Sequence, residues 1–221
     1  MLLDLLVPTR CLGCRDPGPV PFCPDCADEL DPDGTIHPLG DGIATVGAFA
    51  YAHPLSTAIK ATKSGGLRQA ADALARLLAV PADVPVTWVP APRSRRRRRG
   101  IDLPERLAGP DAIRLLERVG RPVEQPDLDA RQRLEAQVDT FRTTRRLHGP
   151  VVLVDDVRAT GATLLAAAST LRDAGADRVL GVTLAAAGGP PSAGRRPRRT
   201  AGRRGPGSTA ASGPTSSRPH G

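Results

Sequence analysis

The sequence predicts an α/β protein: a parallel sheet flanked by helices, preceded by a small cysteine-rich module and followed by a disordered tail. Three observations predict it. Apolar, β-branched runs alternate with helical stretches over residues 43–187, which is typical of strands joined by helical crossovers. All four cysteines lie within residues 11–26. Residues 188–221 consist almost entirely of Gly, Pro, Ser, Ala, Thr and Arg, a composition that cannot bury a packed core.

The N-terminal half contains several short predicted elements. The apolar stretch 2–7 predicts a helix leading into the cysteines, and the turn-rich DPDGTIHPLGDG predicts a hinge at 31–42. A strand is predicted at 43–51. Helices are predicted at 54–63, ending at Ser64-Gly65-Gly66, and at 67–78. These boundaries predict three parts, namely a metal-binding module at 1–35, a sheet domain at 43–187 and a basic tail at 188–221.

The C-terminal half continues the alternation. Strands are predicted at 87–89, 151–154 and 178–186, and helices at 103–119, with a break near Gly109-Pro110, and at 162–174. Residues 94–100 predict a loop that contains five consecutive arginines, Arg95 to Arg99. The stretch 121–149 shows no readable pattern.

The cysteines form two CxxC knuckles separated by eight residues, and they are Cys11, Cys14, Cys23 and Cys26. Four thiolates at this spacing predict one tetrahedral, structural Zn²⁺. Two disulfides are the alternative. The N-terminus MLLDLLVP carries Asp4, lacks a basic leader and is too short for a signal peptide or membrane span. We therefore expect a cytoplasmic protein with reduced thiols.

The most informative segment is VVLVDDVRATGATLL, residues 151–165. A buried strand ends in Asp155 and Asp156, at the edge where open α/β sheets bind ligands. A loop and helix start then supply backbone N–H groups and hydroxyls, which favour an anionic phosphate. The predicted loop residues are Val157, Arg158, Ala159, Thr160, Gly161, Ala162 and Thr163. The pattern predicts a sugar-phosphate site, and the alternative is a pair of aspartates that only caps the helix.

The net charge of +8 is unevenly distributed. Residues 188–221 contain seven arginines and no acidic residue, so the rest of the chain carries only +1. Such a tail can bind nucleic acid electrostatically, although without aromatic residues it cannot stack on bases. A solvated tail without a specific role and a translated frameshift of GC-rich sequence are the alternatives.

Two further groups of cations flank the predicted site. Arg95 to Arg99 follow a predicted strand, which places them at the same sheet edge as the aspartates. Arg99 and Gly100 are candidates for binding pyrophosphate, against the alternative of a solvated charge run. Lys60 and Lys63 are the only lysines of the chain, and a polar helix end is the alternative to a phosphate-facing role.

The pieces CLGC…CPDC, FAYAHPLSTAIKATKSGG, WVPAPRSRRRRRGIDLPERLA and VVLVDDVRATGATL occur in an order that resembles the ComF family of bacterial competence-associated proteins. The last piece resembles the signature of type I phosphoribosyltransferases, which bind 5-phosphoribosyl-1-pyrophosphate (PRPP). The resemblance implies that fold, with Mg²⁺ bridging the pyrophosphate and the ribose hydroxyls. It also implies that the acidic pair binds the ribose and that the loop binds the 5′-phosphate.

The chain departs from the family at three places. Ala159 stands where relatives usually carry Thr, Asp102 stands where they carry Asn, and residues 121–149 match poorly. The sequence therefore leaves two functions open. One is a phosphoribosyltransferase with Asp155 and Asp156 in the catalytic site. The other is a non-catalytic competence factor that binds nucleotide or single-stranded DNA.

Overall fold

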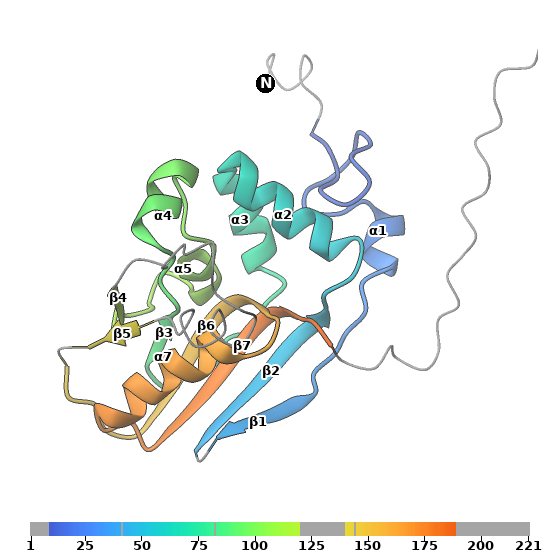
Figure 1. The fold of residues 1–221 in the computed structure, drawn as a ribbon. Coiled ribbons are helices and arrows are strands. Elements are labelled where there is room, and N and C mark those ends of the chain that lie inside the picture. Colours follow the sequence, from blue (N-terminus) through green and yellow to red (C-terminus); the bar gives the residue numbers. More distant parts are fainter. Residues whose placement is uncertain (1–8, 41, 82, 120–139, 144, 189–221) are drawn as a thin grey trace, which may run out of the picture.

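Five strands form the central sheet of the computed structural model, which describes residues 9–40, 42–81, 83–119, 140–143 and 145–188 (Figure 1). In spatial order they are β1 (Ile36–Gly40), β2 (Ile43–Ala50), β7 (Arg178–Ala186), β6 (Pro150–Arg158) and β3 (Val86–Trp88). Strands β2, β7, β6 and β3 are parallel, and β1 pairs antiparallel with β2. The sheet is therefore mostly parallel.

The central strands β6 and β7 are buried because both of their faces are covered. Val151 to Val154 are at most 2% exposed, as expected for a continuous apolar run inside a parallel sheet. Val152 and Val154 face one apolar cluster, whereas Val151 and Leu153 face a second one. This alternation follows from the two-residue period of a strand. The sheet therefore separates two hydrophobic cores.

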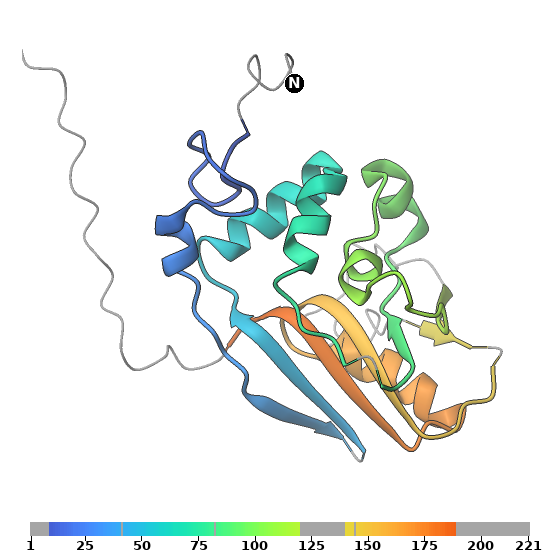
Figure 2. The same cartoon turned by 180° about the vertical axis from the view of Figure 1, so that it is seen from behind.

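The helices divide between these two cores. The first core takes residues from α2 (Leu55–Gly65), α3 (Arg68–Ala75) and α5 (Leu103–Ala108). The second takes residues from α7 (Ala162–Asp173). Figures 1 and 2 show α7 on one side of the sheet and α3 and α5 on the other. The short helices α1 (Pro24–Asp28) and α4 (Arg93–Arg99) lie at the periphery, and β4 (Glu117–Val119) pairs with β5 (Thr140–Arg142) in a small second sheet.

Most strands and helices confirm the predictions. Strand β7 covers the predicted 178–186, β2 and β3 fall within one residue of their predicted ranges, and α2 ends at the predicted glycines. Gly66 closes α2 in the left-handed conformation, φ 60°, which glycine adopts without strain. Helix α7 begins at Ala162, as predicted. The mixed α/β class is confirmed.

The predicted hinge at 31–42 was wrong over 36–40, which form β1. The chain reverses beyond Gly40, with Gly42 at φ 67°, so that β1 folds back on β2 as a hairpin. Residues before it follow β2 as well, since the backbone N–H of Asp33 bonds the carbonyl of Ala48 at 3.0 Å. Turn-type residues in this stretch therefore mark strand ends and not a free linker.

Two predictions on the arginine-rich region were also wrong. Residues 94–99 belong to helix α4 and not to a loop, because arginine is a good helix former and the C-cap Gly100, at φ 68°, supplies the left-handed end. The predicted helix 103–119 stops at Ala108, at the predicted break, where Gly109 takes φ 90° before Pro110. It does not resume after the break, since residues 117–119 form β4, so only the six residues 103–108 form this helix.

The predicted helix at 2–7 and the predicted disordered tail lie outside the described residues, apart from Gly188 at the start of the tail. Within the described ranges, no helix combines the length and the apolar character needed to cross a membrane.

Candidate functional site

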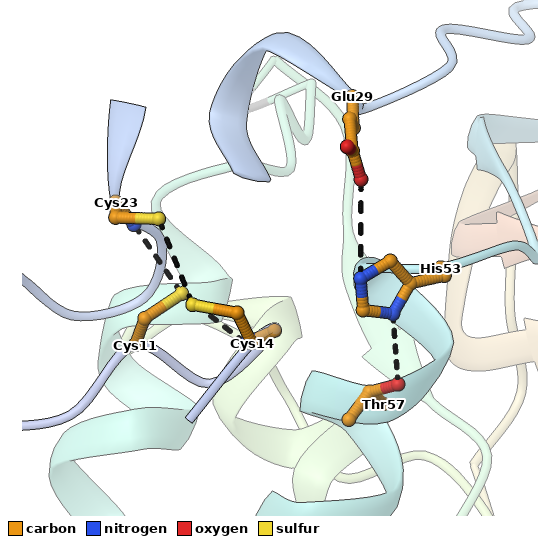
Figure 3. Close-up of polar contacts among 7 residues, drawn as sticks. Cys11, Cys14, Cys23, Glu29, His53 and Thr57 are labelled. Atoms are coloured by element: carbon orange, nitrogen blue, oxygen red, sulfur yellow. Dashed lines mark hydrogen bonds and ion pairs between the residues drawn. The ribbon is translucent and has the colours of Figure 1, made fainter. Parts of the chain in front are cut away.

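The four cysteines converge on one point, and their sulfur atoms lie within 4.8 Å of one another. Cys14 and Cys23 Sγ are 3.8 Å apart (Figure 3). None of the four cysteines forms a disulfide. A tetrahedral zinc with bonds of about 2.3 Å requires sulfur atoms about 3.8 Å apart. The cluster therefore fits a metal ion such as zinc, as the CxxC spacing predicted, and the disulfide alternative is not what the structure shows.

Local backbone geometry prepares this cluster. The N–H groups of Gly13 and Cys23 donate to Cys11 Sγ at 3.4 and 3.3 Å. Although burial acts to raise it, these hydrogen bonds lower the pKa of the Cys11 thiol to about 6. Burial raises the pKa of the Cys26 thiol, and the neighbouring Cys11 raises it further. Metal binding must therefore displace a tightly held proton from Cys26.

The cysteine cluster packs directly on helix α2. Cys11 and Cys26 are buried in the same apolar core as Leu55 and Ile59. A Cβ added to Gly13 would lie 2.6 Å from Pro54 Cβ and 2.8 Å from Cys26 Sγ, so only glycine fits there. The cysteine cluster and α2 therefore share one hydrophobic core, and the cluster packs against the start of α2.

A polar chain reinforces this junction. Glu29 Oε2 lies 3.9 Å from His53 Nε2, and His53 Nδ1 lies 3.3 Å from Thr57 Oγ1 (Figure 3). Glu29 follows α1, His53 directly precedes the N-cap of α2, and Thr57 lies in the first turn of α2. The His53–Glu29 contact is exposed, so it contributes little energy. The contact joins the end of α1 to the segment that leads into α2.

The other end of α2 reaches the predicted acidic pair. Lys63 Nζ lies 2.7 Å from Asp156 Oδ1, and the two side chains are 26% and 12% exposed. The sequence had left Lys63 open between a polar helix end and a ligand-facing role. The structure places it against Asp156, on the face of the sheet that α2 covers.

The acidic pair itself lies within strand β6, whereas the prediction placed it just beyond the strand. Strand β6 continues to Arg158 because β7 runs equally far, and Val157 pairs with Ala185. The predicted loop 157–163 is therefore shortened to 159–161, since Val157 and Arg158 are strand residues and Ala162 and Thr163 are helical. Asp155 Oδ1 accepts the backbone N–H of Asp156 at 2.8 Å.

Asp155 and Asp156 have different electrostatic environments. Burial raises the pKa of Asp155 well above its usual value, and the charge of Asp156 raises it further, against the opposing effect of Lys63 and Arg118. Asp156 instead has the Lys63 ammonium as a direct partner. The raised pKa of Asp155 means that this carboxyl holds a proton more readily than an ordinary aspartate does.

The shortened loop has features of an anion site. Gly161 takes φ 83° and forms the N-cap of α7, which has no side-chain cap. Thr160 Oγ1 accepts the N–H of Ala162 at 3.3 Å. A Cβ on Gly161 would lie 3.0 Å from Leu39 Cδ2, so β1 packs close to this turn. A helix start of this kind attracts negative charge.

Arg99 and Gly100 lie beside the end of α2. A Cβ on Gly66 would overlap the carbonyl of Arg99, which brings the ends of α2 and α4 together three residues after Lys63. Helix α4 buries none of its side chains. The structure therefore places the Arg99 backbone against the end of α2, the helix whose Lys63 contacts Asp156.

Asp102 is a buried carboxylate near the same edge. Its Oδ2 accepts the N–H of Ala91 at 3.1 Å, and its Oδ1 has no hydrogen-bond partner in the described structure. Burial raises the pKa of Asp102 to about 6, with the charges of Glu105 and Asp156 acting in the same direction. The Asp102 carboxyl group, which the resemblance had marked as a departure from the family, is therefore buried.

Sequence reasoning missed Arg118 and placed Arg158 in a loop. Arg118 on β4 donates to the carbonyl of Pro90 at 3.0 Å, packs over the Phe141 ring and acts on Asp155. Arg118 was not identified as a site residue because residues 103–119 were predicted to be helical. Arg158 was taken as a loop residue that offers its backbone, yet its side chain is only 8% exposed. Alternation along a longer strand would have placed Arg158 on the face of Asp156.

A scan against models of known protein families finds no match to this sequence, and a comparison with curated proteins finds none that is significantly similar.

Proposed function

We propose that this chain is a phosphoribosyltransferase-like protein of the ComF family that binds PRPP with Mg²⁺. One observation carries the proposal: the acidic pair Asp155–Asp156 lies near the carboxyl end of the central parallel strand β6 and is followed within a few residues by the start of α7, whose N-cap Gly161 has no side-chain cap. Carboxylates beside an anion-binding helix start suit a molecule that carries both hydroxyls and phosphate. The resemblance of the segment to the PRPP signature points the same way.

In this proposal, each group has a defined task. Asp156 and Asp155 accept hydrogen bonds from the ribose hydroxyls. The backbone at 159–161 and the first turn of α7 hold the 5′-phosphate. Lys63 leaves Asp156 when ligand binds and turns toward the pyrophosphate, while the arginines of α4 add positive charge at the same edge.

The two metals have separate roles. The carboxylate oxygens of Asp155 and Asp156 are the hard ligands that Mg²⁺ prefers, and the ion would neutralise the leaving pyrophosphate. Pyrophosphate departs from C1′ through an oxocarbenium-like transition state, which nearby carboxylates stabilise, and a nitrogen nucleophile attacks. Zinc in the cysteine cluster is structural, because its four ligands leave no open position.

The test of catalysis is release of pyrophosphate from PRPP and Mg²⁺ in the presence of a panel of nitrogen nucleophiles. We expect turnover with the wild type and at least a hundredfold loss in Asp156→Asn. Asp173→Asn, an exposed carboxylate at the end of α7, is the matched control and retains activity. Turnover by Asp156→Asn at the wild-type rate contradicts the proposed site.

A second candidate function is a non-catalytic factor that binds single-stranded DNA. The observation that favours it is α4, RSRRRRR, which buries none of its side chains. Exposed arginines bind phosphates electrostatically, with affinity that falls steeply as salt rises. DNA that binds and competes with PRPP, without pyrophosphate release under any condition, supports this alternative.

A further inference from the structure

Arg158 is a buried arginine whose guanidinium has no counter-ion among the residues that the structure describes. The residue is 8% exposed, and neither Nε nor Nη2 has a hydrogen-bond partner within the described structure. These two nitrogens form one edge of the guanidinium, with their N–H bonds pointing the same way. That edge is the fork that binds two oxygens of one carboxylate or phosphate. A buried charge with this edge unsatisfied is costly unless a ligand completes it.

The backbone fixes the direction of this side chain. Arg158 is the last residue of β6, in register with Ala186, and its carbonyl accepts the N–H of Ala187 at 2.7 Å. Alternation places its side chain on the face of Asp156, about 7 Å further along the strand. That is the face on which Lys63 meets Asp156.

The described carboxylates near this face of the sheet do not pair with Arg158. The Asp156 carboxylate is engaged by Lys63 at 2.7 Å, and Asp102 Oδ2 is engaged by the N–H of Ala91. Neither carboxylate forms an ion pair or hydrogen bond with Arg158. Among the described residues no oxyanion completes this edge of the guanidinium, so an oxyanion ligand would satisfy it.

We propose that the Nε–Nη2 edge of Arg158 is a bidentate site for a phosphoryl group, distinct from the backbone cradle at the start of α7. A phosphoryl dianion suits the site better than a carboxylate, because the Lys63 ammonium lies on the same face and the 159–161 turn follows directly. The choice of phosphoryl over carboxylate rests on the proposed function, whereas the existence of the oxyanion site does not.

The test is the thermal unfolding of the full chain in inorganic phosphate, in acetate and in chloride at matched ionic strength. Phosphate stabilises the wild type with a saturable rise in Tm that chloride does not produce. Arg158→Met, an apolar side chain of similar length, unfolds at a higher Tm than the wild type in chloride and loses the phosphate response. Arg178→Met removes an exposed arginine at the opposite edge and keeps that response.

Each outcome decides the proposal. Arg158→Lys keeps the positive charge but removes the two-pronged guanidinium edge, so its apparent Kd for phosphate should be at least tenfold higher than that of the wild type. If Arg158→Met does not fold, Arg158→Lys alone tests the proposal. An equal phosphate response in wild type and Arg158→Lys overturns the proposal. A response to acetate as large as that to phosphate replaces the phosphoryl assignment with a carboxylate. If the Arg158 variants lose the phosphate response while the wild type does not bind PRPP, this inference holds and the proposed function is rejected.

Discussion

Lys63 Nζ lies 2.7 Å from Asp156 Oδ1, and this contact joins the last turn of α2 to the central strand β6. The same helix begins against the cysteine cluster, where Gly13 packs on Pro54. Helix α2 therefore connects the candidate metal centre to the candidate ligand site.

Lys63→Met should lower the free energy of unfolding by about 2 kcal/mol, because it leaves the largely buried Asp156 carboxylate without its partner. Urea denaturation at neutral pH measures the change. Lys60→Met is the matched control, since Lys60 is exposed, 5.9 Å from the Tyr51 ring centroid, and its loss should cost less than 1 kcal/mol. Equal effects of the two substitutions contradict the structural role of Lys63.

Asp102→Asn should change how stability depends on pH. The pKa of Asp102 is raised to about 6 by burial, so its contribution is fully present below its unfolded pKa of about 4 and is lost as pH rises through about 6. Asparagine removes this loss. The difference in unfolding free energy between variant and wild type should therefore shift in favour of the variant by about 3 kcal/mol between pH 4 and pH 8.

The measurement for Asp102 is urea unfolding of both proteins across that range. A difference that stays constant with pH contradicts the buried, proton-binding state of Asp102. Asparagine is also the residue that the resemblance leads one to expect at this position, so the variant tests whether the departure is costly.

Gly66→Ala should destabilise the protein by more than the cost of its backbone conformation alone. Gly66 has φ 60°, and a Cβ there would overlap the Arg99 carbonyl. Gly34 has φ 68° with nothing within 4 Å of an added Cβ, so Gly34→Ala measures only the conformational cost of about 1 kcal/mol. Thermal or urea unfolding should show the larger loss for Gly66→Ala; equal losses would mean that α2 and α4 do not meet as described.

Metal removal should destabilise the protein beyond residues 11–26. Metal analysis should find one zinc per chain, and chelation should lower the Tm of the cooperative transition, because Cys11 and Cys26 share a core with Leu55 and Ile59. Cys14→Ser should have the same effect. A transition of the sheet that is unchanged after metal loss would show that the cysteine module is independent, as a hinge at 31–42 would have implied.

Sequence patterns predicted the buried strands and the cysteine cluster because their signals are local. The run Val151 to Val154 and the doubled CxxC need no partner to be recognised. The length of β6 could not be predicted, since β7 decides how far Asp155, Asp156 and Arg158 remain paired. Arg118 and the Lys63–Asp156 contact depend on packing between distant segments, which single-sequence patterns do not contain.

The most direct test of the central claim is a calorimetric titration of the full chain with PRPP in the presence of Mg²⁺, because it examines the site without any acceptor. The account predicts saturable binding with one site per chain, weakened at least tenfold, or about 1.4 kcal/mol, by replacing both Asp155 and Asp156 with Asn. Binding that is absent in the wild type, or unchanged in the double variant, would contradict it.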